Sequence, residues 1–425
     1  MDLKQQNVQE QPKKKSSGYV PGFVTGILCS AFIVLIVGLV MLVYHGYTED
    51  EKQWSKEKEE SREEKEVVID DDMLEKMDEI EELIEKYYYE DDIDESLMEE
   101  GAYRGMVDAL GDPYTVYYTP EELQELMEQT TGIYYGIGAY VGLDTVTGYP
   151  KIINPIAGAP AEEADLRPDD IIYEVDGVST YGKDLESVVA MIKGAEGTKV
   201  TLTIVRSTET DYMYVEVERR QVETPTIETE MLEDGIAYIQ ITEFSETTVD
   251  QFADALAVAR ESGMKGLIID LRANPGGSLS AVVDIARMLL PKGLVTYTED
   301  KYGTRKEYSC DGKHEFDLPL VVLVDGNSAS ASEVLAGAIK DYGIGTLVGT
   351  TTFGKGIVQQ IIGMDDGSAL KVTVSSYYSP KGNNIHGTGI EPDLECEFDA
   401  EAYYGEEAFD NQLDYAKDVL RDMMK

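Results

Sequence analysis

Three serines in one short segment are the first residues of this chain whose type and spacing could do chemistry. The segment DGNSASASEVLAGAIKD, residues 325–341, places Ser328, Ser330 and Ser332 in alternation with alanines, directly after the apolar run LPLVVLV. A serine hydroxyl becomes a useful nucleophile only when a neighbouring group removes its proton. A catalytic serine in this segment therefore requires a base from elsewhere in the chain.

Ser330 also has an ordinary structural explanation. The tetrapeptide Ser330-Ala331-Ser332-Glu333 matches the capping box S-x-x-E, in which the serine caps a helix and the glutamate reaches back to the serine N–H. The local pattern alone favours this capping role over catalysis. The identity of the base must decide between the two roles.

None of the 3 histidines is well placed to be that base. His45 borders an apolar segment, His314 lies in a polar loop, and only His386, in NNIHGTGIEPD, follows the serines at a plausible distance. The sequence GNSAS also lacks the final glycine of the G-x-S-x-G nucleophile elbow. A Ser-His-Asp triad is therefore not favoured.

Lys355 is the better proton acceptor. It is the only charged residue between Asp341 and Asp365, in a chain that is 28% charged. A lysine that acts as a base near neutral pH must fall in pKa from about 10.4 toward 7, and removal from water lowers the pKa in that direction. Gly354 and Gly356 allow the backbone and a substrate to approach closely.

Gln359 follows Lys355 by four residues, in the run GIVQQIIG. If this run is a strand, alternation places the Gln359 side chain on the same face as Lys355. Its uncharged amide could orient the lysine amine by hydrogen bonding. No added charge would then oppose the loss of the proton.

A phosphate-binding loop is the rival interpretation of the same lysine. Residues 349–355, GTTTFGK, match G-x-x-x-x-G-K, and LIIDLR resembles the acidic strand that assists magnesium. Gly356, however, stands where the motif requires Ser or Thr, and a β-like run follows where a helix is needed. We therefore reject a nucleotide hydrolase.

Composition excludes further classes of function. The chain has 425 residues, enough for two or three domains, and a formal net charge of -47 that repels nucleic acid. Its 3 cysteines form no Cys/His cluster, so the sequence predicts neither a metal site nor a cofactor. A Cys310–Cys396 bridge stays an open alternative.

The N-terminus predicts a membrane anchor. Residues 19–44 carry no charge and would form a helix of about 39 Å, long enough to span a bilayer. Lys4 and Lys13–Lys15 precede it, so the positive-inside rule puts residues 1–17 in the cytoplasm and everything beyond residue 46 outside. A cleaved signal peptide is the alternative, but its apolar core is normally about 7–15 residues.

The rest of the chain divides by its periodicity into a multidomain α/β (α+β) protein. After the predicted transmembrane helix, 18–46, we place a charged stalk at 47–66 and helices at 67–130. Short strands at 131–222 suggest a small partly open β-barrel. A strand–helix alternation at 223–400 is typical of an α/β layer, and an amphipathic helix follows at 401–425. The amphipathic helices near both ends are candidates for docking or for a homodimer contact.

The motifs, taken together, resemble those of the C-terminal processing peptidases, also called tail-specific proteases. GNSASASEVLAGAIKDYG followed by GTTTFGKGIVQ is similar to their serine–lysine motif, and LGDPYTVYYTPEE, YYGIGAYV, LRPDDIIYEVDG, YIQITEFS, LIIDLRANPGG and GTGIEPD occur in the family's order. The resemblance covers most of the chain after residue 67. It implies Ser330 as nucleophile, Lys355 as general base and Gln359 as the group that holds the lysine.

The resemblance also implies how the reaction is supported. A core of the crotonase-like type would stabilise the oxyanion with the backbone N–H of Ala331 and that of Gly276 or Gly277. The glycines have an alternative explanation as a turn after the GLIIDLR strand.

The barrel-like region resembles a PDZ domain. Its loop Gly136, Ile137, Gly138 and Ala139 would bind a peptide C-terminus through backbone N–H groups while the peptide adds a strand to the sheet. Arg167 is a candidate regulatory residue that could pair with acidic groups of the core and report peptide occupancy.

The predicted anchor and the family resemblance together imply a membrane-anchored serine endopeptidase outside the cytoplasm that recognises protein C-termini. Its expected partners are protein or peptide substrates and the membrane, with no nucleic acid and no cofactor. The alternative from another class is a PDZ-type binding or scaffold protein whose peptidase core is inactive.

Overall fold

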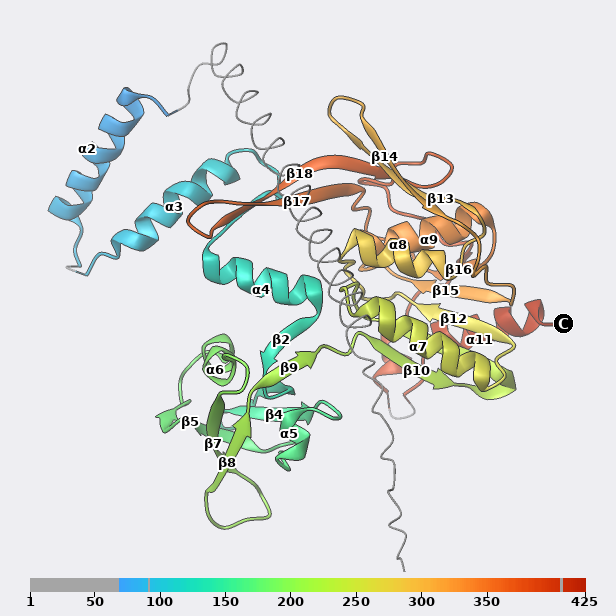
Figure 1. The fold of residues 1–425 in the computed structure, drawn as a ribbon, viewed down its shortest axis with the longest axis horizontal. Helices are drawn as coiled ribbons and strands as arrows, with labels where there is room; N and C mark the ends of the chain where they lie inside the picture. Colours follow the sequence, from blue (N-terminus) through green and yellow to red (C-terminus); the bar gives the residue numbers. More distant parts are fainter. Residues whose placement is uncertain (1–68, 91, 406–407) are drawn as a thin grey trace, which may run out of the picture. The chain divides into compact units, whose positions relative to one another are not determined.

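The computed structural model describes residues 69–90, 92–405 and 408–425, and it divides into two units that meet between Glu95 and Ser96 (Figure 1). The predicted cytoplasmic tail, membrane anchor and stalk lie outside the described residues. In the described part of the chain, no helix combines the length and apolar character needed to cross a bilayer.

The first unit contributes α2 (Asp71–Tyr87), where the spacing of apolar residues predicts a helix. The Asp70 carboxylate caps it by accepting a 2.9 Å hydrogen bond from the Met73 N–H. No residue of α2 is buried, and Met77 and Ile80 of its apolar stripe are exposed.

The second unit begins with the two further helices that the sequence predicts, α3 (Glu95–Asp108) and α4 (Pro120–Thr131). A short strand that the sequence did not predict, β1 (Val116–Tyr118), lies between them. Thr119 and Glu122 form a capping box at the start of α4, where Pro120 occupies the first turn. The helix ends at Gly132, whose left-handed backbone (φ 74°) stops the helical hydrogen bonding.

A small β-rich domain follows α4. Its six-stranded sheet has the order β3-β4-β5-β7-β8 with β6 beside β5, while β2 and β9 pair with each other. The bounds are β2 (Ile133–Gly136), β3 (Ala139–Leu143), β4 (Pro150–Pro155), α5 (Pro160–Glu163), β5 (Ile171–Val175), β6 (Val178–Ser179), α6 (Leu185–Ile192), β7 (Lys199–Val205), β8 (Met213–Glu218) and β9 (Arg220–Glu223). Fully buried Ile152, Ile172, Leu202 and Ile204 fill its core.

A mostly parallel sheet of the order β10-β11-β12-β15-β16-β19 forms the centre of the larger domain, and only β10 runs antiparallel. The bounds are β10 (Ile227–Met231), β11 (Ile236–Ile241), β12 (Gly266–Asp270), β15 (Leu320–Val324), β16 (Thr346–Gly349) and β19 (Leu394–Glu395). Every residue of β12 and β15 is buried, as expected for parallel strands covered on both faces.

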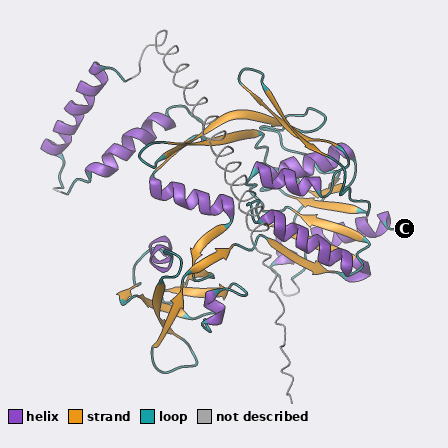
Figure 2. Cartoon of the chain, in the orientation of Figure 1, coloured by secondary structure: helices purple, strands orange, loops and turns teal. Residues whose placement is uncertain are grey.

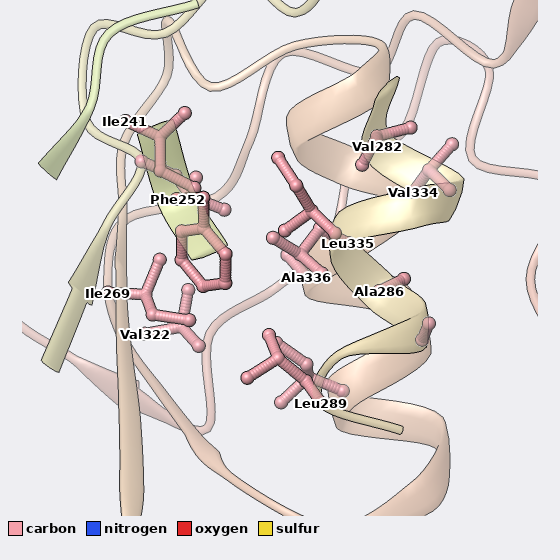
Figure 3. Packing of buried hydrophobic residues seen from close by; sticks show 14 of the residues in the cluster. Ile241, Phe252, Ile269, Val282, Ala286, Leu289, Val322, Val334, Leu335 and Ala336 are labelled. Carbon is pink, nitrogen blue, oxygen red and sulfur yellow. The ribbon is translucent and has the colours of Figure 1, made fainter. Parts of the chain in front are cut away.

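Three helices cover one face of this sheet: α7 (Thr248–Glu261), α8 (Leu279–Arg287) and α9 (Ala331–Tyr342). Figure 3 shows Phe252 lying between Ile241 and Ile269 of the sheet and the α9 side chain Leu335. Burying one such large side chain stabilises the fold by about 1.5–3 kcal/mol. This packing fixes α9, and with it the segment of three serines, against the sheet.

The C-terminal helix α11 (Asn411–Met423) covers the other face of the same sheet. Ala416 and Leu420 are fully buried there among residues of β12, β15 and β16. The Arg272 guanidinium, at the end of β12, pairs with the Asp410 carboxylate at 2.8 Å where α11 begins. This amphipathic helix therefore docks on its own chain, which is one of the two roles that the sequence left open.

A second sheet of the larger domain has the order β1-β18-β13-β14, with β17 beside β18 (Figure 2). Its further strands are β13 (Gly293–Asp300), β14 (Arg305–Cys310), β17 (Ile357–Gly363) and β18 (Ala369–Tyr378), and the short helix α10 (Ala400–Tyr403) follows later in the chain.

Cys310 and Cys396 are both free, so the bridge between them that the sequence left open is not formed.

Candidate active site

A cavity of about 390 Å³ brings together the side chains that the sequence singles out. Ser330, Lys355 and Gln359 line it, and so do the three residues proposed as oxyanion donors, Ala331, Gly276 and Gly277. They come from the start of α9, the start of β17 and the loop after β12. Groups more than eighty residues apart in the chain thus share one pocket.

The three alternating serines have different surroundings. The Ser328 hydroxyl is buried and donates to the Leu271 carbonyl at 2.7 Å, and the buried Ser332 hydroxyl donates to the Asn274 carbonyl at 3.0 Å. Ser330 is half-buried and is the one of the three that lines the cavity. Two hydroxyls thus hold the loop after β12, and the third residue lines the cavity.

Ser330 adopts an unusual backbone conformation, with φ 54° and ψ −112°. A non-glycine residue held in such a conformation costs about 1–3 kcal/mol and persists only where neighbours hold it in place. Two side chains do so here. The Glu333 carboxylate accepts from the Ser330 N–H at 2.8 Å, and the buried Tyr377 hydroxyl donates to the Ser330 carbonyl at 2.9 Å.

The predicted capping box at the start of α9 is present in part. Ser330 and Glu333 are arranged as its two members, and the glutamate completes its half of the exchange. The Glu333 N–H, however, donates to the Ser330 carbonyl at 2.9 Å, and the Ser330 side chain makes no capping hydrogen bond. Capping by the glutamate therefore leaves the serine hydroxyl available.

Glu333 is the most heavily bonded side chain beside the cavity, and it is 1% exposed. Besides the Ser330 N–H, its carboxylate accepts from the Thr352 hydroxyl at 2.6 Å, from the Gly354 N–H at 2.7 Å and from the Lys355 N–H at 2.8 Å. A buried carboxylate needs such donors to offset its lost hydration. One carboxylate therefore ties the backbone of the serine to the backbone of the lysine.

Lys355 is half-buried, and burial lowers the pKa of its amine. The nearby Lys371 ammonium lowers the pKa further, while the Asp112 carboxylate raises it. The Lys355 Nζ lies 4.7 Å from the centre of the Tyr114 ring, a contact that also favours the charged form. The two lowering effects prevail, in the direction that a general base requires.

Gln359 lines the cavity, but its hydrogen bond differs from the one expected. Its Nε2 donates to the Thr373 hydroxyl of β18 at 3.3 Å. A register shift between Val358 and Gln359 interrupts the alternation that the same-face prediction assumed. Within the described residues, no hydrogen bond joins the Gln359 amide to the Lys355 amine.

The oxyanion candidates differ in whether their N–H groups are free. The Gly276 N–H donates to the Asn274 Oδ1 at 2.8 Å, which occupies this candidate donor. In the described part of the chain, the N–H groups of Gly277 and Ala331 donate to no other group. A Cβ on Gly276 would lie 2.8 Å from the Ser330 Cβ, so this glycine is required for close approach.

The structure favours neither a histidine base nor a phosphate-binding loop. His314 and His386 are exposed and do not line the cavity, and His45 lies outside the described residues. The segment that matches a phosphate loop runs from β16 into β17, so a strand stands where that motif needs a helix.

The loop Gly136 to Ala139, predicted to bind a peptide C-terminus, connects β2 to β3 of the small domain. The Ile137 carbonyl accepts from the Ala161 N–H at 2.7 Å, and the Gly138 carbonyl accepts from the Ile156 N–H at 2.9 Å. Gly138 has a φ of 74°, and a Cβ there would lie 2.3 Å from the Ala159 Cβ. This position therefore requires glycine on both grounds.

Arg167, the candidate regulatory residue, pairs within its own loop. Its guanidinium donates to the Asp165 carboxylate at 2.7 Å, and the side chain is mostly exposed. Among the described residues, it makes no ion pair with an acidic group of the larger domain.

The sequence analysis assigned no role in the site to four residues around the cavity: Tyr114, Glu333, Lys371 and Tyr377. Glu333 was assigned only to capping, and Tyr114 lies in LGDPYT, which served only to support the family resemblance. Lys371 and Tyr377 reach the site from β18, a strand that begins 39 residues after Ser330. No local spacing links them to Ser330, so only the paired strands reveal them.

Comparison with known proteins matches this architecture. The family model "Peptidase family S41" matches residues 235–396, "PDZ domain" matches residues 151–206, and "Activating protease CtpB N-terminal domain" matches residues 35–122. The small β-rich domain is thus a PDZ domain, and the larger domain is an S41 protease core.

Curated relatives agree. The carboxyl-terminal-processing protease of Synechocystis sp. is 39% identical over 68% of each chain. The carboxy-terminal processing protease CtpB of Bacillus subtilis is 37% identical over 76% of this chain and 67% of that protein. The solved photosystem II D1 C-terminal processing protease is 31% identical over 74% of this chain and 86% of that one, with a TM-score of 0.44.

The chain therefore belongs to the carboxyl-terminal-processing proteases of peptidase family S41. It is a serine protease that carries a PDZ domain.

Proposed function

We propose that this chain is a membrane-anchored endopeptidase that binds substrate proteins by their C-termini and hydrolyses peptide bonds with a Ser330–Lys355 dyad. The observation that carries the proposal is the shared cavity. It joins a serine with a free hydroxyl, a lysine of lowered pKa and two unoccupied backbone N–H groups. These are the parts that acyl transfer to serine requires.

The reaction would proceed in two halves. The neutral Lys355 amine takes the Ser330 hydroxyl proton as the oxygen attacks the peptide carbonyl, and the N–H groups of Ala331 and Gly277 stabilise the oxyanion. The Lys355 ammonium then protonates the leaving amine, which departs with the C-terminal fragment. In the second half, Lys355 takes a proton from a water that attacks the acyl carbonyl. The Lys355 ammonium then returns this proton to the Ser330 oxygen as the bond to the acyl group breaks and the carboxylic acid leaves.

Tail recognition would fall to the PDZ domain. The substrate C-terminus would add a strand beside β3 while the loop at Gly138 binds its carboxylate. Glycine is required at Gly138 by its backbone angle and by the nearby Ala159, which supports a loop shaped for backbone contacts.

Location outside the cytoplasm is proposed from residues 19–44 and the lysines that precede them. Protease added to intact cells should cut beyond residue 46 and leave an epitope at residue 4 protected. Protection of the catalytic domain in intact cells, with cutting after lysis, would contradict this topology.

The dyad is tested by Ser330→Ala and Lys355→Ala in the full-length chain. Each should reduce kcat/KM for a tailed substrate by on the order of 10⁴-fold or more, because the dyad members act as one unit. Ser328→Ala is the matched control. Its hydroxyl bonds to the Leu271 carbonyl, so cleavage should survive although some stability is lost.

Circular dichroism should show that both dyad variants remain folded. Cleavage at the wild-type rate by either folded variant would refute the proposed mechanism. A wild-type Ser330 that a fluorophosphonate probe fails to label would instead favour a protein that binds without cutting.

A further inference from the structure

A second cavity, of about 720 Å³, adjoins the catalytic one. It lies between α4 and α6, and the two cavities share Gln129 and Glu243 in their linings. Tyr134 and Lys193, which also line the second cavity, are the side chains that a Cβ at Gly136 would approach. The second cavity thus shares residues with the cavity of Ser330 and is also lined by side chains next to Gly136, the first residue of the loop proposed to bind the substrate C-terminus.

The surroundings of Glu243 are unusual. It follows β11, is half-buried, and lines both cavities. Among the described residues, its carboxylate forms no ion pair and accepts no hydrogen bond. Burial raises its pKa, and no neighbouring charge contributes to that shift. A carboxylate partly removed from water without a partner is unfavourable unless a ligand supplies the missing cation or donors.

The charged side chains that line the second cavity are mostly negative, as Glu243 is. Its lining includes the side chains Glu121, Glu125, Glu128 and Glu186, against one cation, Lys193. The Lys193 Nζ is already engaged, because it lies 2.6 Å from a Glu128 carboxylate oxygen. The protein therefore supplies no free cation to Glu243 within this lining.

We propose that Glu243 is a specificity-determining residue that binds a lysine or arginine side chain of the substrate, on the C-terminal side of the cleaved bond. This inference rests on the proposed function, in which the bound tail extends from Ser330 toward the PDZ loop, and Glu243 lines both cavities in this region. A basic side chain there would supply the free cation that the lining of the second cavity lacks, and the four other glutamates of that cavity would favour its approach.

The test compares matched peptides with the full-length enzyme. A peptide with a free C-terminus carries Lys, Gln or Glu at each position between the cleaved bond and the terminus, and kcat/KM is measured for each. At one position the wild-type kcat/KM should be on the order of tenfold higher for the Lys peptide than for the Gln peptide. A factor of this size corresponds to one hydrogen-bonded ion pair that is partly removed from water.

Glu243→Gln should reduce this Lys/Gln ratio to about one, and Glu243→Lys should reverse the preference toward Glu. Because the ratio compares two peptides on one enzyme, a change in folding or overall turnover cancels. Glu246→Gln, an exposed residue three positions later, is the matched control and should keep the wild-type ratio.

The possible outcomes separate the two proposals. If the wild type shows no position with a preference for Lys, or if Glu243→Gln keeps the preference, the inference is overturned while the peptidase stands. If the wild type cuts none of the peptides and a fluorophosphonate does not label Ser330, the proposed function itself fails.

Discussion

Ser330 shows how a strained residue is maintained by its neighbours. Its N–H is bound by the Glu333 carboxylate and its carbonyl by the Tyr377 hydroxyl, so both peptide groups around the positive φ are fixed. A neutral hydrogen bond contributes about 1 kcal/mol, and a hydrogen bond to a charged group contributes more. These two hydrogen bonds are therefore enough to offset strain of this size. Backbone strain is thus combined with an accessible hydroxyl.

The pH dependence of the reaction should follow the amine of Lys355. Only the neutral amine can accept the serine proton, so activity should fall as the pH drops through the pKa of Lys355. Lys371→Gln removes the neighbouring cation that lowers this pKa, so the pKa should rise and the acidic limb of the kcat/KM profile should move to higher pH.

Lys381→Gln is the matched control for this experiment, since Lys381 is exposed and lies outside the catalytic cavity. Lys371→Gln also removes the hydrogen bond from the Lys371 Nζ to the Tyr118 hydroxyl, whereas Asp112 and Tyr114 beside the Lys355 amine are unchanged. An acidic limb at the same pH in Lys371→Gln and wild type would contradict this role.

Between elements, Glu333 connects α9 to the segment that leads into β17. Its Oε2 accepts from the N–H groups of both Ser330 and Lys355, and its Oε1 accepts from Thr352 and Gly354. In Glu333→Gln an amide NH₂ must face two of these donors. We expect a loss of about 2–5 kcal/mol in the free energy of unfolding and a large loss of activity.

Urea unfolding, followed by circular dichroism, measures this change, and activity is measured on the folded protein. Glu315→Gln, an exposed glutamate, is the control and should change stability by less than about 0.5 kcal/mol. A Glu333→Gln variant that matches this control in both stability and activity would show that the shared carboxylate is dispensable.

The elements themselves were largely predictable. The periodicity of the chain indicates α2, α6 and α7, and the apolar runs LIIDLR and LPLVVLV indicate β12 and β15, because buried parallel strands are almost wholly apolar. The β13–β14 hairpin and β18 were not predicted. Most residues of β18 are only half-buried and mix polar with apolar side chains, so neither strict alternation nor a continuous apolar run marks the strand.

The candidate site could be proposed from the sequence to the extent that it is local or carried by family motifs. Lys355 stood out because its neighbours in sequence are uncharged, and Ser330 was chosen through the resemblance. Tyr377 and Lys371 could not be found, because they reach Ser330 and Lys355 only through strand pairing. The expected contact from Gln359 to Lys355 is absent from the described residues, since alternation cannot anticipate a β-bulge.

At the scale of the molecule, the recognition of a tail and its cleavage should be separable. Gly138→Ala puts a Cβ 2.3 Å from the Ala159 Cβ at a φ of 74°, so the PDZ loop must distort. We expect kcat/KM for a tailed substrate to fall on the order of tenfold or more, while a fluorophosphonate still labels Ser330 at the wild-type rate.

Gly148→Ala is the matched control, because Gly148 has the same φ of 74° but open space around its Cβ position. The two variants share the backbone strain and differ in the collision. Equal cleavage of tailed substrates by both would remove the loop at Gly138 from substrate binding.

The shared carboxylate of Glu333 also limits how such an enzyme can be switched off. One buried carboxylate accepts hydrogen bonds from the main-chain N–H groups of both the proposed nucleophile and its proposed base. The two backbones therefore cannot separate without leaving that carboxylate short of donors. An inactive state would therefore cost less free energy if the lysine side chain rotated or the entrance of the cavity closed than if these backbones separated. The activity of this protease would then be controlled by substrate access, while the proposed catalytic residues stay in place.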